Sequence, residues 1–274
     1  MSTCNVSHIK MTTYKRRTHR LSFGSLICLC ISMVGCGGGS GGVSAASTLN
    51  MGLIHEWKFD GDTNDSIGTL NGTAVGPVTY VKGMIGQAIV LNGSTTGVNV
   101  PAAPDLQFQK SFSITAWASL YSYPDPSQGA SSIIFDGDDR NGLDPYTLMV
   151  LPSGNLQFSV DGAAQPNGGI DIWGKMPLNK FVCIAATYDQ KSGALRLYKN
   201  GILTGENLFN SALTPVVPLD PASNPGVGIG TNNSFPDSYV NYGFNGAIND
   251  LRVYNRALTG SEVQALYREG LAGR

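Results

Sequence analysis

The stretch GFNGAINDLRVYNRALTGSEV, residues 243–263, decides the fold of this 274-residue chain. Its first half alternates between two sets of side chains, which is the pattern of a β-strand. The strand would place Ala247, Asn249, Leu251 and Val253 on one face and Ile248, Asp250, Arg252 and Tyr254 on the other. The stretch therefore begins with one long strand.

The period of this pattern changes at Thr259. Thr259-Gly260-Ser261-Glu262 is typical of a capping box, in which the Thr hydroxyl accepts a backbone N–H and the Glu carboxylate reaches back. Val263, Leu266 and Tyr267 then form a short apolar stripe at helical spacing. The pattern predicts a short helix after the strand, and no other segment predicts one.

Apolar runs separated by turn residues predict many more strands. They lie at residues 53–59, 83–92, 111–121, 131–135, 146–151, 156–160, 181–188, 194–199 and 226–230, with Val98 and Val100 continuing the sheet of 83–92. Asn200-Gly201 predicts a hairpin, because both residues tolerate positive φ. Strands of this number and spacing bury their apolar faces by packing as two antiparallel sheets, which predicts an all-β sandwich.

Three patterns resemble one family. The opening stretch has the form G-x-I-x-D-x-R-x-Y-x-R-A-L, residues 57–66 have the form W-x-F-D followed by D-S, and residues 112–117 have the form F-S-I-x-A-W. They resemble the laminin G-like domains of bacterial surface proteins, in the concanavalin A-like lectin/glucanase superfamily. The resemblance implies an all-β, two-sheet antiparallel jelly-roll β-sandwich with one short C-terminal helix. It also implies that the first and last strands lie side by side. Asn249 stands where that family often has a second Asp.

The segment before Cys36 has the layout of a signal peptide. Basic residues at 14–20 precede an apolar run from Leu21 to Val34, which is too short for a comfortable membrane span. Gly35-Cys36, with aliphatic residues before it, resembles a bacterial lipobox, which predicts cleavage before Cys36 and lipidation of this cysteine. The alternative is an ordinary secretory leader with a chance cysteine. Translation could start at Met1 or at Met11.

This layout predicts three parts of the chain. They are a lipoprotein-type signal peptide at 1–35, a Gly/Ser-rich tether at 36–48 and one laminin G-like jelly-roll domain at 49–274. Gly37, rather than Asp, follows the cysteine, which resembles the outer-membrane default of Gram-negative lipoproteins. We expect a lipid-anchored protein of the bacterial cell envelope, in the outer membrane, facing either the periplasm or the outside.

The distribution of charge excludes one class of partner. Five of the 18 Lys and Arg residues precede Cys36, so residues 36–274 carry 13 of them against all 19 Asp and Glu residues, a net charge of −6. Without a basic excess, nucleic acid is not an expected partner. Cys183 is the one cysteine after Cys36 and lies in an apolar run, so we expect a buried structural thiol and no disulfide.

One acidic turn predicts a calcium site. Asp60, Asp62 and Asp65 offer carboxylate oxygens within a few residues, and the family resemblance places this turn near Asp250. Ca²⁺ prefers several oxygen ligands on a loop that can bend around it. The prediction is a structural calcium ion held by these four residues. The alternative is a solvated turn, with Asp250 paired to Arg252 or Arg256.

A second acidic cluster and several loop side chains could bind a ligand. Sugars stack on aromatic rings while amides and carboxylates take their hydroxyl groups. The predicted ligand-binding residues are Asp136, Asp138, Asp139, Tyr239 and Tyr242. The cluster could instead bind metal or be only a polar loop. Further loop candidates are Tyr121, Tyr123, Trp173, Asn232, Asn233 and Phe235, and Trp117 is either a stacking platform or a packing residue.

The sequence shows no catalytic pattern. Jelly-roll glucanases, which the fold resembles, carry a strand of the form E-x-D-x-E, whereas the glutamates here are scattered at 56, 206, 262 and 269. His55 is the one histidine after Cys36, and residues 49–274 contain no G-x-S-x-G. We expect a non-catalytic envelope lipoprotein that binds a carbohydrate or another envelope or extracellular protein. The alternative is a glycan hydrolase or lyase with a divergent acidic pair.

Overall fold

The computed structural model describes residues 45–127, 129–137, 144–160, 169–171, 175–208, 226–232 and 242–273. The chain divides between residues 41 and 42, and every described residue belongs to the second unit. The predicted signal peptide, Cys36, Asp138, Asp139 and Tyr239 lie outside the described residues. Within the described part, no helix is long and apolar enough to cross a membrane.

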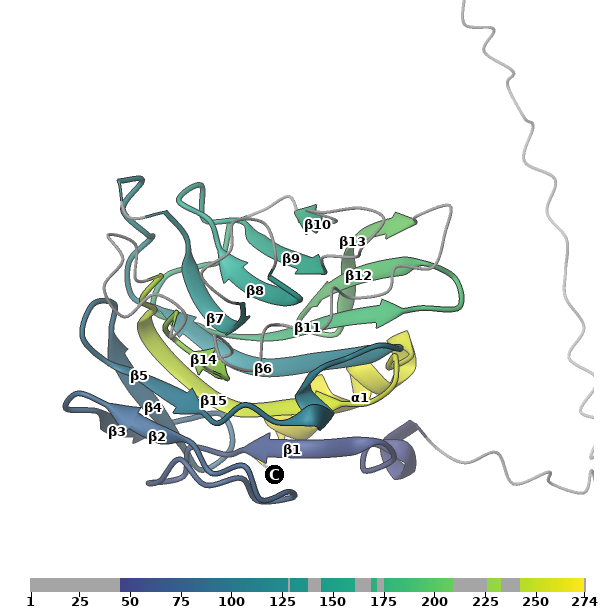
Figure 1. The fold of residues 1–274 in the computed structure, drawn as a ribbon, viewed down its shortest axis with the longest axis horizontal. Helices are drawn as coiled ribbons and strands as arrows, with labels where there is room; N and C mark the ends of the chain where they lie inside the picture. Colours follow the sequence, from purple (N-terminus) through teal and green to yellow (C-terminus); the bar gives the residue numbers. More distant parts are fainter. Residues whose placement is uncertain are drawn as a thin grey trace, which may run out of the picture. The chain divides into compact units, whose positions relative to one another are not determined.

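The described strands form two antiparallel sheets, as predicted (Figure 1). The eight-stranded sheet has the order β13 (Ile202–Leu208), β12 (Ala194–Lys199), β11 (Phe181–Asp189), β6 (Phe112–Leu120), β15 (Asn245–Tyr254), β4 (Gln87–Asn92) and β3 (Thr79–Lys82), with β1 (Leu53–Trp57) also paired to β15. The seven-stranded sheet has the order β10 (Gly169–Asp171), β9 (Leu156–Val160), β8 (Tyr146–Val150), β7 (Ser131–Asp136), β14 (Val227–Ile229), β5 (Gly97–Val100) and β2 (Thr73–Val75).

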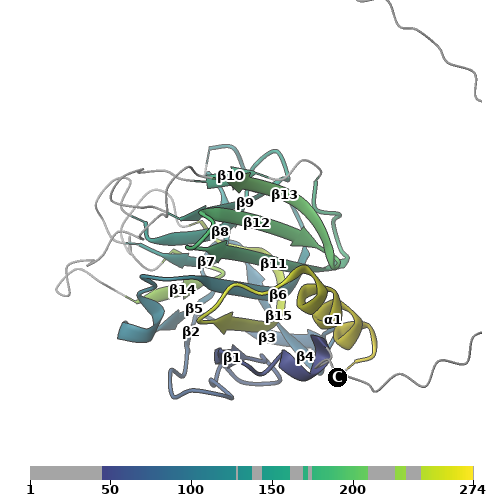
Figure 2. The ribbon, with the colours of Figure 1, turned by 90° about the vertical axis from the view of Figure 1, so that its right-hand side faces the viewer.

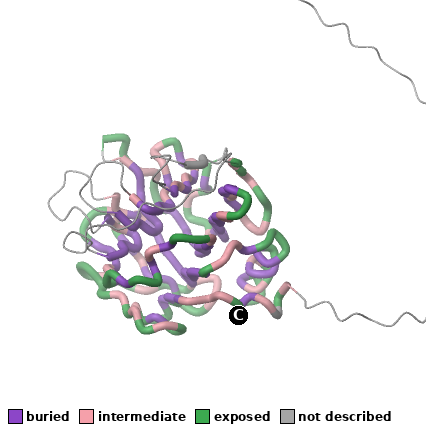
Figure 3. The backbone as a smooth tube through the Cα atoms, turned by 45° about the vertical axis from the view of Figure 1, so that its right-hand side comes forward, coloured by how far each residue is buried: buried purple, intermediate pink, exposed green. Residues whose placement is uncertain are grey.

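The two sheets lie face to face and enclose the main core. Figure 2 shows β11, β12 and β13 in front of β8, β9 and β10. Figure 3 shows that the buried segments follow the strands, whereas the connecting loops are largely exposed. Apolar side chains from both sheets form one cluster, which includes Phe112, Ile134, Tyr146, Leu197 and Ile229. The predicted sandwich is confirmed. One assignment was wrong, because Val98 and Val100 lie in β5 of the smaller sheet and do not continue the sheet of β4.

Strand β15 has two different partners along one edge. Its first part, Asn245–Ile248, pairs with β4, and its second part pairs with β1 through Leu251 to Tyr254. The first and last strands therefore lie side by side, as the sequence predicted. On the other edge the register against β6 shifts between Asn249 and Arg252, so two residues of β15 face one residue of β6 in a bulge.

The bulge corrects the predicted faces of β15. Strict alternation puts Ile248 on one face of the strand and Leu251 and Val253 on the other. In the structure, however, all three side chains lie in the core between the sheets. The extra residue at the bulge changes the phase of the strand, because a shift of one residue moves side chains to the other face. Asp250 takes up the change in direction with a left-handed φ of 52°. Aspartate and asparagine tolerate this conformation better than most residues.

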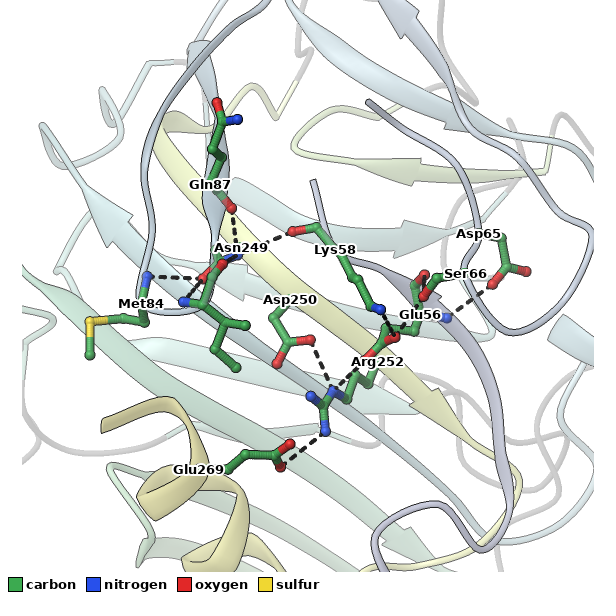
Figure 4. Close-up of polar contacts among 11 residues, drawn as sticks. Glu56, Lys58, Asp65, Ser66, Met84, Gln87, Asn249, Asp250, Arg252 and Glu269 are labelled. Atoms are coloured by element: carbon green, nitrogen blue, oxygen red, sulfur yellow. Dashed lines mark hydrogen bonds and ion pairs between the residues drawn. The ribbon is translucent and has the colours of Figure 1, made fainter. Parts of the chain in front are cut away.

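Asn249 fills the gap between β1 and β4. Its side-chain oxygen accepts hydrogen bonds from the N–H groups of Met84 and Ile85, and its NH₂ donates to the carbonyls of Lys58, Ile85 and Gln87 (Figure 4). The residue is fully buried. Leaving one such backbone group without a partner costs about 1–3 kcal/mol, so the Asn249 amide stabilises the sheet where β1 and β4 meet β15.

The terminal helix α1 (Gly260–Leu271) covers the outer face of the larger sheet. The predicted capping box is confirmed, since Thr259 accepts from the Glu262 N–H and Glu262 accepts from the Thr259 N–H. Trp117 is buried and stacks on Tyr267 of α1 at 5.8 Å between ring centroids, which makes it a packing residue. A 3₁₀-helix, η1 (Ala45–Thr48), also belongs to this end, where Thr48 donates to Glu262. The last residues of the predicted tether are therefore part of the folded domain.

Candidate functional site

The predicted calcium ligands lie around the junction of β1 and β15. Asp65 follows β1 and organises its own loop. Its Oδ1 accepts hydrogen bonds from the N–H groups of Glu56, Ile67 and Gly68 at 2.9–3.1 Å. Its Oδ2 lies 2.7 Å from His55 Nδ1 and accepts from the Leu70 N–H. Burial alone would raise the pKa of Asp65, but the His55 bond and the backbone N–H groups outweigh it and lower that pKa.

His55 is a buried structural residue. Besides Asp65, its ring faces Asp105, with Nε2 and Oδ2 3.3 Å apart, and it stacks on Trp57. The side chain is 2% exposed. This histidine therefore joins two loops and packs against the core, as a core or edge histidine does.

Arg252 is the centre of a buried ionic cluster (Figure 4). Its Nε lies 2.9 Å from Glu56 Oε1 and 2.9 Å from Asp250 Oδ1, and its Nη1 lies 3.4 Å from Glu269 Oε2 on α1. Glu56 is directly opposite Arg252 in the β1–β15 pairing. Ser66 and Lys58 also contact Glu56, at 2.6 Å and 3.6 Å. One guanidinium thus serves three carboxylates from two strands and a helix.

Burial and the neighbouring charges shift the pKa values of Asp250 and Arg252. Burial raises the pKa of Asp250 to about 6, with Arg252 opposing the shift and the charge of Glu56 adding to it. For Arg252, burial would lower the pKa, but Asp250 and the other neighbouring acids raise it overall. The cluster borders a hollow of about 360 Å³, whose polar walls include Lys58, Asp60 and Glu269.

The four predicted residues do not fit a calcium ion as one set. The oxygens of Asp65 are occupied by N–H groups, and Asp250 is bonded to Arg252, which is the alternative considered from the sequence. Asp60 accepts from the Gln87 N–H, and Asp62 bonds to Asn64 in its own turn. Across the described ranges, no group of three or more His, Cys, Asp or Glu side chains could hold a metal ion. Binding of a structural calcium ion by this chain stays a prediction.

The second acidic cluster is only partly described. Asp136 ends β7 and is 2% exposed, so it does not fit the predicted role of a direct ligand contact. Tyr242 stacks on Phe135, with ring centroids 5.8 Å apart, and burial together with the charge of Asp144 raises its pKa. Asp138, Asp139 and Tyr239 lie outside the described residues, so their predicted role stays a prediction.

Sequence reasoning missed most of the ionic cluster. Asp250 and its pairing with Arg252 were considered, but the roles of Glu56 and Glu269 were not. Cross-strand pairing of Glu56 with Arg252 follows from the register of β1 on β15, which no short motif reveals. The buried thiol of Cys183 agrees with its predicted structural role, since burial raises its pKa to about 12.

Comparison with known proteins assigns the fold to a family. A family model described as the concanavalin A-like lectin/glucanases superfamily matches residues 92–264. The chain belongs to this family. Among curated proteins, none matches the sequence.

Three solved structures illustrate what this family member is similar to. Domain 4 of AbnA, a GH43 extracellular arabinanase from Geobacillus stearothermophilus in complex with arabinotriose, is 25% identical with a TM-score of 0.57, over 78% of this chain and 98% of that one. A chain from a study of ganglioside-dependent cell entry by botulinum neurotoxin type C is 17% identical with a TM-score of 0.61, over 82% and 52%. A Trypanosoma rangeli sialidase is 19% identical with a TM-score of 0.53, over 79% and 32%. The family member spans about half of the toxin chain and a third of the sialidase, and these two likenesses show the fold alone.

The raised pKa of Asp250 predicts a pH dependence of stability. Between about pH 4 and pH 6 the folded protein holds a proton that the unfolded chain has released, so the free energy of unfolding falls as pH rises through this range. Asp250→Asn keeps a residue suited to positive φ and removes the titrating group. Its free energy of unfolding relative to wild type should therefore increase from pH 4.5 to pH 7.5 in urea titrations.

Asp189→Asn is the control for this experiment. A hydrogen bond from Ser192 lowers the pKa of Asp189, so its contribution is lost only as pH falls towards that pKa. The difference between this variant and wild type should be flat from pH 4.5 to pH 7.5. A flat difference for Asp250→Asn as well would contradict the assignment.

The arrangement also predicts how calcium affects stability. A ligand that binds only the folded state raises the melting temperature, and EDTA reverses that effect. Because Asp60 and Asp250 have other partners, Asp60→Asn and Asp250→Asn should leave the difference between melts in CaCl₂ and in EDTA the same as in wild type. A calcium effect that both substitutions abolish would restore the site predicted from the sequence.

Proposed function

We propose that this domain binds a carbohydrate and does not cleave it. The observation that carries the proposal is the similarity to domain 4 of the arabinanase, whose structure holds arabinotriose and of which 98% is matched. Membership of the concanavalin A-like superfamily supports the same class of ligand. Another envelope or extracellular protein is the alternative ligand, as the sequence left open.

The ionic cluster supports binding without cleavage. A retaining glycosidase holds two carboxyl groups roughly 5–5.5 Å apart on either side of the scissile bond. Glu56 and Asp250 both contact Arg252 Nε at 2.9 Å, so a guanidinium lies where the glycosidic oxygen would have to sit. The Glu56 and Asp250 side chains are only 7% and 6% exposed.

A glycan hydrolase or lyase is the second candidate function. The observation in its favour is the pKa of Asp250, which burial raises to about 6, the direction a general acid needs. This candidate requires Arg252 to leave the two carboxylates when substrate binds.

We propose further that the domain is held on a bacterial envelope by a lipid at Cys36, in the outer membrane. The basic and apolar leader, the Gly35-Cys36 pair and the Gly/Ser-rich segment after it support this placement. The tether would hold the glycan-binding domain at the membrane surface.

Glycan binding is tested with the full chain, extracted in detergent. On an array of neutral and acidic glycans it should bind at least one carbohydrate, and titration calorimetry should confirm that binding. The same glycan should yield no new reducing ends after prolonged incubation. Turnover that Glu56→Ala or Asp250→Ala abolishes would favour the hydrolase, and an array without binders, together with recovery of an envelope protein in a pull-down, would favour the protein ligand.

Lipidation is tested by metabolic labelling with a palmitate analogue. Wild-type protein should carry the label and fractionate with the outer membrane, whereas Cys36→Ser should lose both properties. Cys183→Ser is the control. Because Cys183 is buried in the folded domain, its substitution should leave the labelling unchanged. Label that persists in Cys36→Ser would contradict the proposed anchor.

A further inference from the structure

A polar hollow opens at the end of the sandwich where the two sheets meet. It measures about 210 Å³ and lies at the Asn245 end of β15, beside the last residue of β4 and the first residue of β7. The loop after β6 closes its remaining side through Ser122 to Asp125. The hollow is separate from the ionic cluster, whose residues are absent from its lining.

The backbone around the hollow is held firmly. The Tyr121 N–H donates to the Asn245 carbonyl at 2.9 Å, and the Ser132 N–H donates to the Tyr242 carbonyl at 2.7 Å. Gly243 packs so closely on Gly93 that a Cβ there would lie 2.4 Å from its backbone. Tyr123 is fixed by a hydrogen bond from its hydroxyl to the Met176 carbonyl and by Lys175 Nζ, 5.2 Å from the ring centroid. A preformed wall loses little freedom when a ligand binds.

Side chains from two distant segments supply the polar groups of the hollow. Asn245 Nδ2 donates to Ser122 Oγ at 2.7 Å, which leaves the amide oxygen as an acceptor and the serine hydroxyl as a donor. Asp125 Oδ1 accepts from the N–H and hydroxyl of Ser127, and these bonds lower the pKa of Asp125. The second oxygen of this ionised carboxylate remains for a ligand.

The polar and apolar groups that line the hollow match the hydroxyl and C–H groups of a sugar ring. A carboxylate accepts from hydroxyl groups, an amide and a hydroxyl can both donate and accept, and the ring of Tyr123 with Pro124 offers an apolar wall for C–H groups. The volume is below the roughly 300–1,000 Å³ of pockets for drug-sized ligands, so it suits one ring. The negative charge of Asp125 opposes an anionic sugar.

We propose that this hollow binds one neutral sugar residue, with Asp125, Asn245 and Ser122 contacting its hydroxyl groups and Tyr123 and Pro124 covering part of its ring. The assignment rests on the proposed carbohydrate-binding function and names its site. It places recognition on the loops at one end of the sandwich.

The test uses the full chain in detergent and the best neutral glycan from the array, measured by titration calorimetry. Asp125→Asn and Asn245→Ala should each weaken binding at least tenfold, because the first removes the charge of an acceptor for sugar hydroxyl groups and the second removes the amide. Asp189→Asn should bind as wild type. It is a matched control, since Asp189 also accepts from an N–H two residues ahead and from a nearby serine hydroxyl, outside the hollow.

The selectivity for neutral sugars gives a second readout. A uronic acid counterpart of the same glycan should bind wild type more weakly, and Asp125→Asn should reduce that preference because it removes the repelling charge. If both variants bind the neutral glycan like wild type, this inference is overturned while the proposed function stands. If no glycan on the array binds wild type, both are overturned.

A structural measurement covers the case in which a variant loses stability. Wild-type crystals soaked with the same glycan should show a sugar ring in the hollow, in contact with Asp125 and Asn245. A sugar found only elsewhere on the domain would overturn the assignment and leave carbohydrate binding itself intact.

Discussion

Strand β15 must serve two neighbours along a single edge, and the rest of the domain depends on how it does so. Where pairing with β4 ends and pairing with β1 begins, backbone groups of two chain segments, at Lys58 and at residues 84–87, point into a gap. Buried groups of this kind need partners. The side chain of Asn249 contacts five backbone groups there, because its oxygen accepts from two N–H groups and the two protons of its NH₂ are shared among three carbonyls. A carboxylate could accept from the two N–H groups but could not donate to the carbonyls, which gives a physical reason for Asn rather than Asp at this position.

The same changeover creates the ionic cluster. The bulge after Asn249 turns Asp250 towards Arg252 and away from the core, while cross-strand pairing brings Glu56 and α1 brings Glu269. Arg252, a side chain of the strand itself, supplies the buried positive charge among these acids, while the exposed Lys58 lies 3.6 Å from Glu56. Breaking such a buried set by removing the guanidinium would leave its acids uncompensated, which is more costly than replacing the whole set. The ionic cluster therefore helps to hold β1, β15 and α1 together.

Local patterns carried the prediction of the fold a long way. Alternation located β6, β8 and β9, and the capping box placed the start of α1 at the right residue. The juxtaposition of β1 and β15 followed from the family resemblance. Short or exposed strands such as β2 and β3 were not predicted, because few of their side chains reach the core. The switch of sheets between β4 and β5 is a matter of topology, which periodicity does not encode.

The site was less predictable than the fold, for a physical reason. The acidic turn around Asp65 suggested a calcium ion shared with Asp250. In the structure, backbone N–H groups bond to the oxygens of Asp65 and Arg252 bonds to Asp250. The hollow at the other end combines Asp125 with Asn245, which are far apart in the chain and belong to no motif. Their proximity depends on the pairing of the first part of β15 with the end of β6, where Gly246 is opposite Leu120.

The opposite ends of β15 have different neighbours. Ala45, from which the chain continues towards Cys36, packs in the cluster that contains Tyr254, whereas the hollow adjoins Asn245. A ten-residue strand is roughly 30 Å long. The strand therefore acts as a spacer, which keeps the hollow a full strand length from the end of the domain at which the described chain begins.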